Sequence, residues 1–222
     1  MAITLDYDLK EPYGSFEAIP LNEEEAARLQ TFKDWRKATA EAVDLKWTMA
    51  MVRSKAPLIE NEKAIFPFDE ALIPKKLRVF RGTPDWDFCA QTGVAYAVSQ
   101  RFKDLIEGIE PEVHEFVPFE LYDKQSKKIE RSYFFWRIRV QLDAVTPELG
   151  GLKMLGSGPS HGWSMVPGGQ DRLAVRKERI AGHAAWYDIR YINQIFVSDR
   201  VLAGLEAQKL KGWRVVNVWK EI

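Results

Sequence analysis

A short pattern that occurs twice most constrains how this chain can fold. Residues 98–107 and 197–206 each begin with valine and serine, carry an arginine at the fourth position, and continue into an amphipathic segment. An apolar run precedes each serine, and a second apolar run follows each amphipathic segment. Ser99 and Ser198 stand where a helix would begin, so each side chain is expected to accept a hydrogen bond from a free N–H of the first turn. The pattern predicts two strand–helix–strand units.

The two copies match at a constant offset of 99 residues, which predicts an internal duplication. The matched pairs are Val98/Val197, Ser99/Ser198, Arg101/Arg200, Ile106/Leu205 and Glu107/Glu206. The arginines are unexpected, because a cation at the second helical position opposes the helix dipole. Either each arginine reaches back to a carboxylate or carbonyl in the sheet, or the pair binds an anion.

The N-terminal residues predict one strand and one long helix. Ile3, Leu5 and Tyr7 alternate with polar residues, which indicates an edge strand. Asn22 then precedes three glutamates, a favourable helix start because the Asn side chain can cap and the acids complement the dipole. The helical pattern can continue to about Ser54. We therefore expect a mostly helical N-terminal region at 1–82 and an α+β domain at 83–222.

The remaining residues predict the sheet that carries the two helices. Pro118 in the strand after the first helix indicates an edge or a bulge. Residues 131–142 are rich in aromatic and β-branched side chains, which favours one half-buried antiparallel strand. The predicted fold class is α+β, with an antiparallel or mixed sheet carrying both serine-capped helices on one face and the helical N-terminal part alongside.

Composition indicates an ordinary globular protein and excludes a general polyanion binder. The 222 residues hold 32 basic and 32 acidic side chains, so the formal net charge is zero. Residues 1–30 carry seven acidic and two basic side chains, whereas 151–222 carry eleven basic and six acidic. Without Lys/Arg clusters, this mild asymmetry predicts no nucleic-acid partner. Eight tryptophans can serve the core or a partner surface.

The chain is expected to work in the bacterial cytoplasm, without a membrane anchor. Cys89 is the single cysteine, so no intrachain disulfide can form, which fits a reducing compartment. The first residues lack the basic start and apolar core of a signal peptide. No run approaches the roughly 18 apolar residues of a membrane span.

Residues 147–171 form a glycine- and proline-rich stretch that is expected to be a long functional loop. It holds seven of the fourteen glycines. Residues 158–162 match the G-x-S-x-G pattern of serine hydrolases, with Asp171 and His183 downstream, but the strand before and the helix after are missing. No dinucleotide or phosphate-binding glycine motif has its required context, so no cofactor is predicted.

The candidate chemical residues favour structural interpretations. His114, His161 and His183 have no partner at metal-ligand spacing, and the first and last sit in strand-like segments as expected structural histidines. Two acidic pairs, Asp85/Asp87 and Glu110/Glu112, flank turns and are interpreted as solvated turn residues. No catalytic or metal site is predicted.

Three segments resemble a known protein family. They are Gly93-x-x-Tyr96-x-Val98-Ser99-x-Arg101-Phe102; the run from Glu110-Pro111-x-Val113-His114 to Leu121-Tyr122-Asp123, with the aromatic strand ending at Leu142-Asp143-Ala144; and Ile195–Asp199 with Leu210–Trp213. Together they resemble the immunity proteins of bacterial polymorphic toxin systems, the myxobacterial-type immunity domain first catalogued as a domain of unknown function. The resemblance covers about residues 85–222.

The resemblance implies a non-enzymatic cytoplasmic protein that binds and neutralises a cognate toxin. The toxin is expected to be encoded beside it and delivered by contact-dependent or type VI secretion. Two surfaces are expected to contact the toxin: the glycine-rich stretch, with His161, Trp163 and Asp171, and the acidic helix start, with Glu23, Glu24 and Glu25. Two alternatives stay open: a small enzyme, hydrolytic or modification-reversing, that uses the 147–171 stretch as a lid, and a regulatory or scaffold domain with no toxin.

Overall fold

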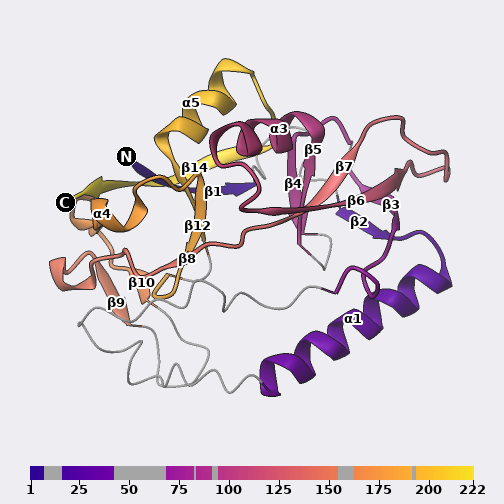
Figure 1. Ribbon diagram of the computed structural model, residues 1–222, viewed down its shortest axis with the longest axis horizontal. Helices are drawn as coiled ribbons and strands as arrows, with labels where there is room; N and C mark the ends of the chain where they lie inside the picture. Colours follow the sequence, from indigo (N-terminus) through magenta and orange to yellow (C-terminus); the bar gives the residue numbers. More distant parts are fainter. Residues whose placement is uncertain (8–16, 43–68, 83, 92–94, 155–162, 192–193) are drawn as a thin grey trace.

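The computed structural model describes residues 1–7, 17–42, 69–82, 84–91, 95–154, 163–191 and 194–222 (Figure 1). The fold is α+β, with two mixed six-stranded sheets. The first sheet has the order β2-β3-β6-β7-β5-β4, formed by β2 (Glu17–Pro20), β3 (Lys76–Arg81), β6 (Glu115–Tyr122), β7 (Tyr133–Arg137), β5 (Tyr96–Ser99) and β4 (Phe88–Gln91). The predicted α+β class is confirmed.

The second sheet brings the two ends of the chain together. Its order is β11-β14-β1-β13-β12-β8, formed by β11 (Ala174–Val175), β14 (Trp213–Glu221), β1 (Ala2–Tyr7), β13 (Ile195–Ser198), β12 (Ala185–Asp188) and β8 (Gln141–Leu142). A hairpin of β9 (Leu152–Met154) and β10 (Trp163–Met165) stands apart. The stretch predicted as a long loop therefore contains a hairpin and two 3-10 turns, η1 (Pro147–Leu149) and η2 (Gln170–Arg172).

The two repeated segments adopt the same strand pairing. β5 and β6 flank the helix α3 (Gln100–Ile109) in the chain, and β13 and β14 flank α5 (Asp199–Ala207). In the sheets an antiparallel strand separates the two members of each pair, β7 in the first unit and β1 in the second. Whether this likeness arose by duplication stays a prediction.

Both serine caps are confirmed. The Ser99 hydroxyl accepts a hydrogen bond from the Phe102 N–H, and the Ser198 hydroxyl accepts one from the Val201 N–H. Each serine has extended backbone angles, as the residue before a helix requires. The two helices contact each other and lie on the same side of the sheets (Figure 1).

The predicted edge position of the first strand is wrong. β1 lies between β13 and β14 in the sheet. The alternation of Ile3 and Leu5 with polar residues correctly indicates a strand, but it does not show how many strands pair with it. Ala2 and Thr4 are also fully buried, so both faces of β1 are covered. The first residues thus complete a sheet whose other strands come from residues 141–221.

The single strand predicted at 131–142 is also wrong, because the chain changes sheets there. β7 ends at Arg137, and β8 belongs to the second sheet. Within β7 the neighbouring side chains Phe135 and Trp136 are both buried, in two different hydrophobic clusters. β7 is therefore covered on both faces rather than half-buried.

Three hydrophobic clusters hold the layers together. The central cluster joins both sheets to α3 and α5. A second cluster packs the first sheet against α1 (Glu23–Ala42), which runs beneath that sheet in Figure 1, and a third covers the opposite face of the second sheet. Trp86, Trp136, Trp186 and Trp219 are buried, so these four tryptophans serve the core.

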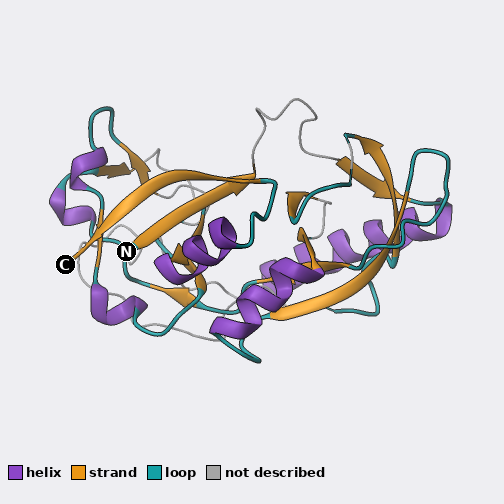
Figure 2. Ribbon diagram, turned by 90° about the horizontal axis from the view of Figure 1, so that it is seen from above, coloured by secondary structure: helices purple, strands orange, loops and turns teal. Residues whose placement is uncertain are grey.

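The predicted start of the N-terminal helix is confirmed, because the Asn22 side chain accepts a hydrogen bond from the Glu25 N–H at 3.0 Å. The predicted extension to Ser54 lies outside the described residues. A mostly helical region at 1–82 is not confirmed, since β1, β2 and β3 also come from it. The domain division near residue 82 stays a prediction, and strands from both sides of it share each large sheet. In Figure 2 the strand that starts beside the N mark, β1, runs next to the long strand that ends at the C mark, β14.

Candidate interaction surface

Two of the three histidines converge on one buried glutamate, Glu110, immediately after α3. Its carboxylate lies 2.8 Å from Nδ1 of His183 and 3.2 Å from Nε2 of His114, and it accepts the Ala184 N–H at 2.6 Å. Burial alone would raise the pKa of Glu110, but these three hydrogen bonds lower it to about 2. Because Arg139 N–H donates to Nδ1 of His114, Nε2 of that ring is the donor to Glu110. The cluster joins the end of α3 to the residues just before β12.

This arrangement supports the structural interpretation of His114 and His183 and corrects that of Glu110, which is not a solvated turn residue. Its partner Glu112 is exposed, as expected. Residue patterns near the turn could not show that His183, 73 residues away in sequence, would meet the Glu110 carboxylate. Only His114 lies within one helical turn of Glu110 in sequence, at i+4.

The interpretation of the other acidic pair, Asp85/Asp87, is also wrong for one of its members, Asp87. Its side chain is 2% exposed and accepts hydrogen bonds from the Ser99 hydroxyl at 2.7 Å, from Nη2 of Arg131 at 2.5 Å and from the Lys211 N–H at 2.9 Å. The neighbouring Asp85 is exposed and pairs with Nζ of Lys211 at 2.8 Å. One member of the pair is thus a buried anchor for the cap of α3, and the other is a solvated turn residue.

A third buried cluster carried no sequence signal. Nε of Arg190 lies 2.5 Å from the Asp143 carboxylate, and both side chains are fully buried. Asp188 accepts backbone N–H groups of Ala144, Val145 and Arg190, each at 2.8 Å. Burial raises the pKa of Asp188 to about 6, although these backbone hydrogen bonds oppose the shift. The cluster fastens β8 to β12.

The two repeated arginines also have structural partners. Arg101 donates to the carbonyl of Gln208, at the end of α5, and lies 3.8 Å from the Asp87 carboxylate. Arg200 donates to the carbonyl of Gly182 at 3.1 Å. Of the two alternatives, the one in which each arginine reaches a carbonyl describes the structure, although these carbonyls lie in loops rather than in the sheet.

Within the described part of the chain, no three His, Cys, Asp or Glu side chains are grouped so that they could hold a metal ion. The clusters around Glu110, Asp87 and Asp143 are bonded internally.

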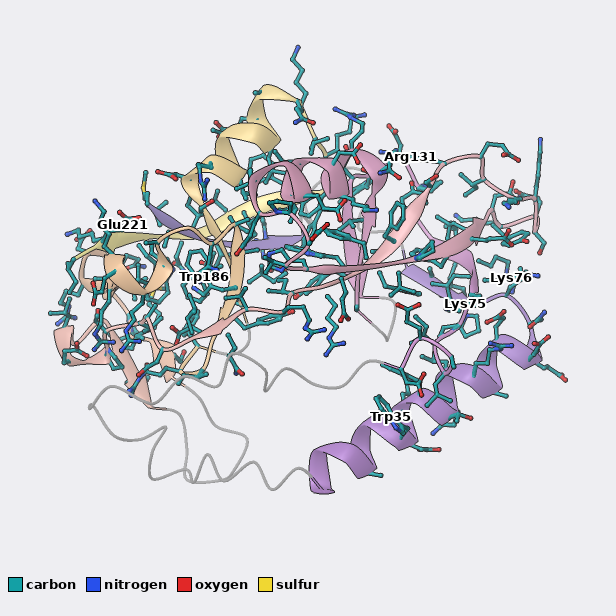
Figure 3. The ribbon with its side chains drawn as sticks, in the orientation of Figure 1. Trp35, Lys75, Lys76, Arg131, Trp186 and Glu221 are labelled. Atoms are coloured by element: carbon teal, nitrogen blue, oxygen red, sulfur yellow. The ribbon has the colours of Figure 1, made fainter. Side chains whose placement is uncertain are left out.

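The sequence-predicted contact residues lie in two separate places. Glu23 and Glu24 are exposed at the start of α1, whereas Glu25 is buried and accepts the Lys75 N–H at 2.8 Å; Figure 3 shows Lys75 above that end of the helix. Trp163 begins β10, and Asp171 is exposed in η2. His161 and the G-x-S-x-G segment lie outside the described residues. The structure does not bring the two predicted surfaces together.

Asp171 borders a surface hollow that sequence patterns did not indicate. The hollow, of about 480 Å³, runs along β14 from Met1 and η2 past Val216, Val218 and Glu221. Three valines of β14 are exposed there or beside it: Val215, Val216 and Val218, at 39%, 38% and 50%. Glu221, which also lines the hollow, lies near the C-terminal end of β14 (Figure 3). A run of exposed valines on a strand is unusual enough to mark a candidate contact surface.

The helices in the described part of the chain offer no membrane span, since none combines sufficient length with sufficient apolar character.

Comparison with known proteins agrees with the resemblance seen in the sequence. No curated protein matches the chain. A family model described as "Immunity protein family (Imm11)" matches residues 28–220, which is most of the chain and includes both repeated units. Proteins of such immunity families are typically non-enzymatic, which fits the internal bonding of the polar clusters. The chain therefore belongs to the Imm11 immunity protein family.

Proposed function

We propose that this protein binds a cognate bacterial toxin by direct protein–protein contact and thereby neutralises it. The observation that carries the proposal is the family match over residues 28–220. The buried clusters around Glu110, Asp87 and Asp143 support it, because their polar atoms stabilise the fold and leave binding to the surface. The toxin would belong to a polymorphic system delivered by contact-dependent or type VI secretion, and the immunity protein would act in the cytoplasm.

Two surfaces are proposed for contact. The first is the β14 side, where Asp171 borders the hollow and β10 carries Trp163 in the neighbouring hairpin. The second is the exposed start of α1, where Glu23 and Glu24 could meet a basic toxin surface. Glu25 would act by fixing the position of this helix, because its carboxylate is occupied by Lys75.

Co-expression with the toxin domain encoded by the neighbouring gene tests the proposal. We expect the protein to restore growth and to form a stable one-to-one complex, measured by size-exclusion chromatography with light scattering. An immunity protein from an unrelated toxin pair serves as the control. Restored growth without a stable complex, together with a covalent change in the toxin or its target, would instead favour the enzymatic alternative that uses residues 147–171.

A further inference from the structure

The outer edge of β14 is paired over only its last residues. The Lys220 N–H donates to the Leu173 carbonyl and the Ile222 N–H to the Val175 carbonyl, each at 3.0 Å. The Lys177 N–H in turn donates to the Ile222 carbonyl at 2.9 Å. These bonds form a parallel ladder between β14 and β11, which pairs with β14 at two positions.

The ladder ends because the chain before β11 turns away into η2. Leu173, which would donate next to the Val218 carbonyl in a continued parallel ladder, donates its N–H to Gln170 instead, at 3.2 Å. The Asp171 carbonyl, next in line to accept from Val218, accepts Nζ of Lys220 at 2.8 Å. Backbone groups alternate sides along a strand, so Val218 faces the same edge as Lys220. Among the described residues, none pairs with the Val218 backbone on that side.

The equivalent strand of the first unit has the same half-open edge. The Glu120 N–H of β6 donates to the Lys75 carbonyl at 2.8 Å, just as Lys220 donates to Leu173. Two residues earlier, β6 carries Pro118 where β14 carries Val218. The cross-strand partners agree with this equivalence, since Pro118 is paired with Phe134 of β7 and Val218 with Ile3 of β1.

Proline at this position closes the edge chemically. It has no N–H to donate, and natural proteins use it on exposed edges to prevent pairing with another chain. Val218 keeps its N–H, is β-branched, and lies beside the exposed Val216. One unit thus blocks its open edge, while the other presents an edge suited to an incoming strand.

We propose that β14 binds an extended segment of the toxin as an added β-strand, centred on Val218. This inference rests on the proposed function, because the family match supplies the need for a protein partner. The added strand would hydrogen-bond to the Val218 backbone, and its apolar or β-branched side chains would pack on the valines and enter the hollow that Met1 and Asp171 border. η2 limits the length of the strand at the C-terminal end of β14.

The test uses the full chain and the toxin domain encoded by the neighbouring gene. V218P removes the outward N–H and places in the second unit the residue that the first unit already carries, so the fold should tolerate it. V218K keeps the N–H but adds a charge that opposes strand pairing. We expect each variant to weaken binding by roughly tenfold or more, measured by calorimetry. F80K, which changes an exposed apolar residue of the other large sheet, on β3, is the matched control and should bind like the wild type.

Hydrogen exchange separates the outcomes. In the complex, the Val218 amide should exchange far more slowly than in the free protein. A complex that forms with unchanged Val218 exchange and unchanged affinity of V218P and V218K would overturn strand addition but not the proposed function. Absence of any complex with the wild type would overturn both. If the free protein is a dimer that V218P dissociates, the edge serves a second copy of this chain, and the proposal for the toxin fails.

Discussion

The two strand–helix–strand units share their pairing but differ in what they do with polar and apolar groups. In both, the capping serine donates its N–H to the residue before the adjacent strand: Ser99 to the Asp87 carbonyl and Ser198 to the Ala184 carbonyl, each at 2.9 Å. In the first unit that residue is Asp87, which has a buried carboxylate, and in the second it is Ala184, which has only a methyl group. The first unit is braced by internal charge and has a proline-blocked edge, whereas the second leaves its edge apolar and open. Both units contribute to the core, and the open edge of the second is the feature on which the proposed strand addition depends.

Replacing the buried carboxylate is expected to have the largest effect. D87A would give the first unit the residue that the second has at this position. It would leave the Ser99 hydroxyl and the Lys211 N–H without their acceptor and Arg131 without its 2.5 Å partner. We expect the free energy of unfolding to fall by about 3 kcal/mol, measured by urea denaturation.

D85A is the control, because Asp85 pairs from an exposed position with the Arg131 side chain and with Nζ of Lys211, whose backbone N–H donates to Asp87. It should leave the unfolding midpoint close to that of the wild type. Equal midpoints for D85A and D87A would show that the first unit does not depend on its internal carboxylate.

Acid is expected to weaken the contact between α3 and β12. Glu110, at the end of α3, hydrogen-bonds to His183 and Ala184, which lie just before β12. The hydrogen bonds hold the folded pKa of Glu110 at about 2, below the ordinary value of 4.5. A lowered carboxyl pKa contributes stability that is fully present above the unfolded pKa and is lost as pH falls from about 4.5 to about 2. We expect a loss of roughly 3 kcal/mol across that window.

E110Q should flatten this pH dependence, measured as the free energy of unfolding from pH 5 to pH 2. E107Q, which changes a more exposed glutamate in the last turn of α3, should keep the wild-type slope. If the slope of E110Q is unchanged, the acid sensitivity arises at other carboxylates. Asp188 is not one of them, because its raised pKa makes the folded state more stable as pH falls below about 6.

The contact between the helices is the next largest difference. Leu105 of α3 and Gly204 of α5 occupy matched positions in the two copies, and a Cβ on Gly204 would collide with Cδ1 of Leu105. G204L, which would make the copies alike, should lower the free energy of unfolding by about 2 kcal/mol through overpacking. Adding L105A should recover much of that loss.

G108A provides the contrast within α3, because a Cβ there meets nothing within 4 Å. It should raise the free energy of unfolding by about 0.5–1 kcal/mol through better helix propensity. A neutral G204L measured by thermal and urea unfolding would mean that the helices can move apart.

Structural features that depend on neighbouring residues could be predicted from the sequence, whereas features that depend on distant residues could not. The serine caps, the Asn22 cap and the α+β class follow from residue types at short spacing. The central position of β1, the sheet change after Arg137 and the burial of Asp87 depend on partners far along the chain, which periodicity does not reveal.

The candidate surface divides in the same way. Asp171 was predicted as a contact residue and lies beside the hollow, but the open edge of β14 was not predicted. The exposure of three valines in β14 was not expected, because a valine in a strand is usually buried. These residues are Val215, Val216 and Val218. Pro118 did indicate an edge, and its counterpart in the second unit is Val218, because the two residues have equivalent cross-strand partners.

The capping serines themselves should show the smallest difference. Both accept an N–H of the first helical turn, but the Ser99 hydroxyl also donates to the buried Asp87 carboxylate at 2.7 Å. S99A therefore removes a cap and leaves a buried acceptor with one donor fewer, whereas S198A removes a cap alone. We expect losses of about 2 and about 1 kcal/mol in the free energy of unfolding. S99T and S198T, which keep a hydroxyl, should recover part of each loss, and adding D87A should erase the difference between the two alanine variants. If S99A and S198A remain unequal in that background, the asymmetry of the units lies in the caps and not in the carboxylate behind the first one.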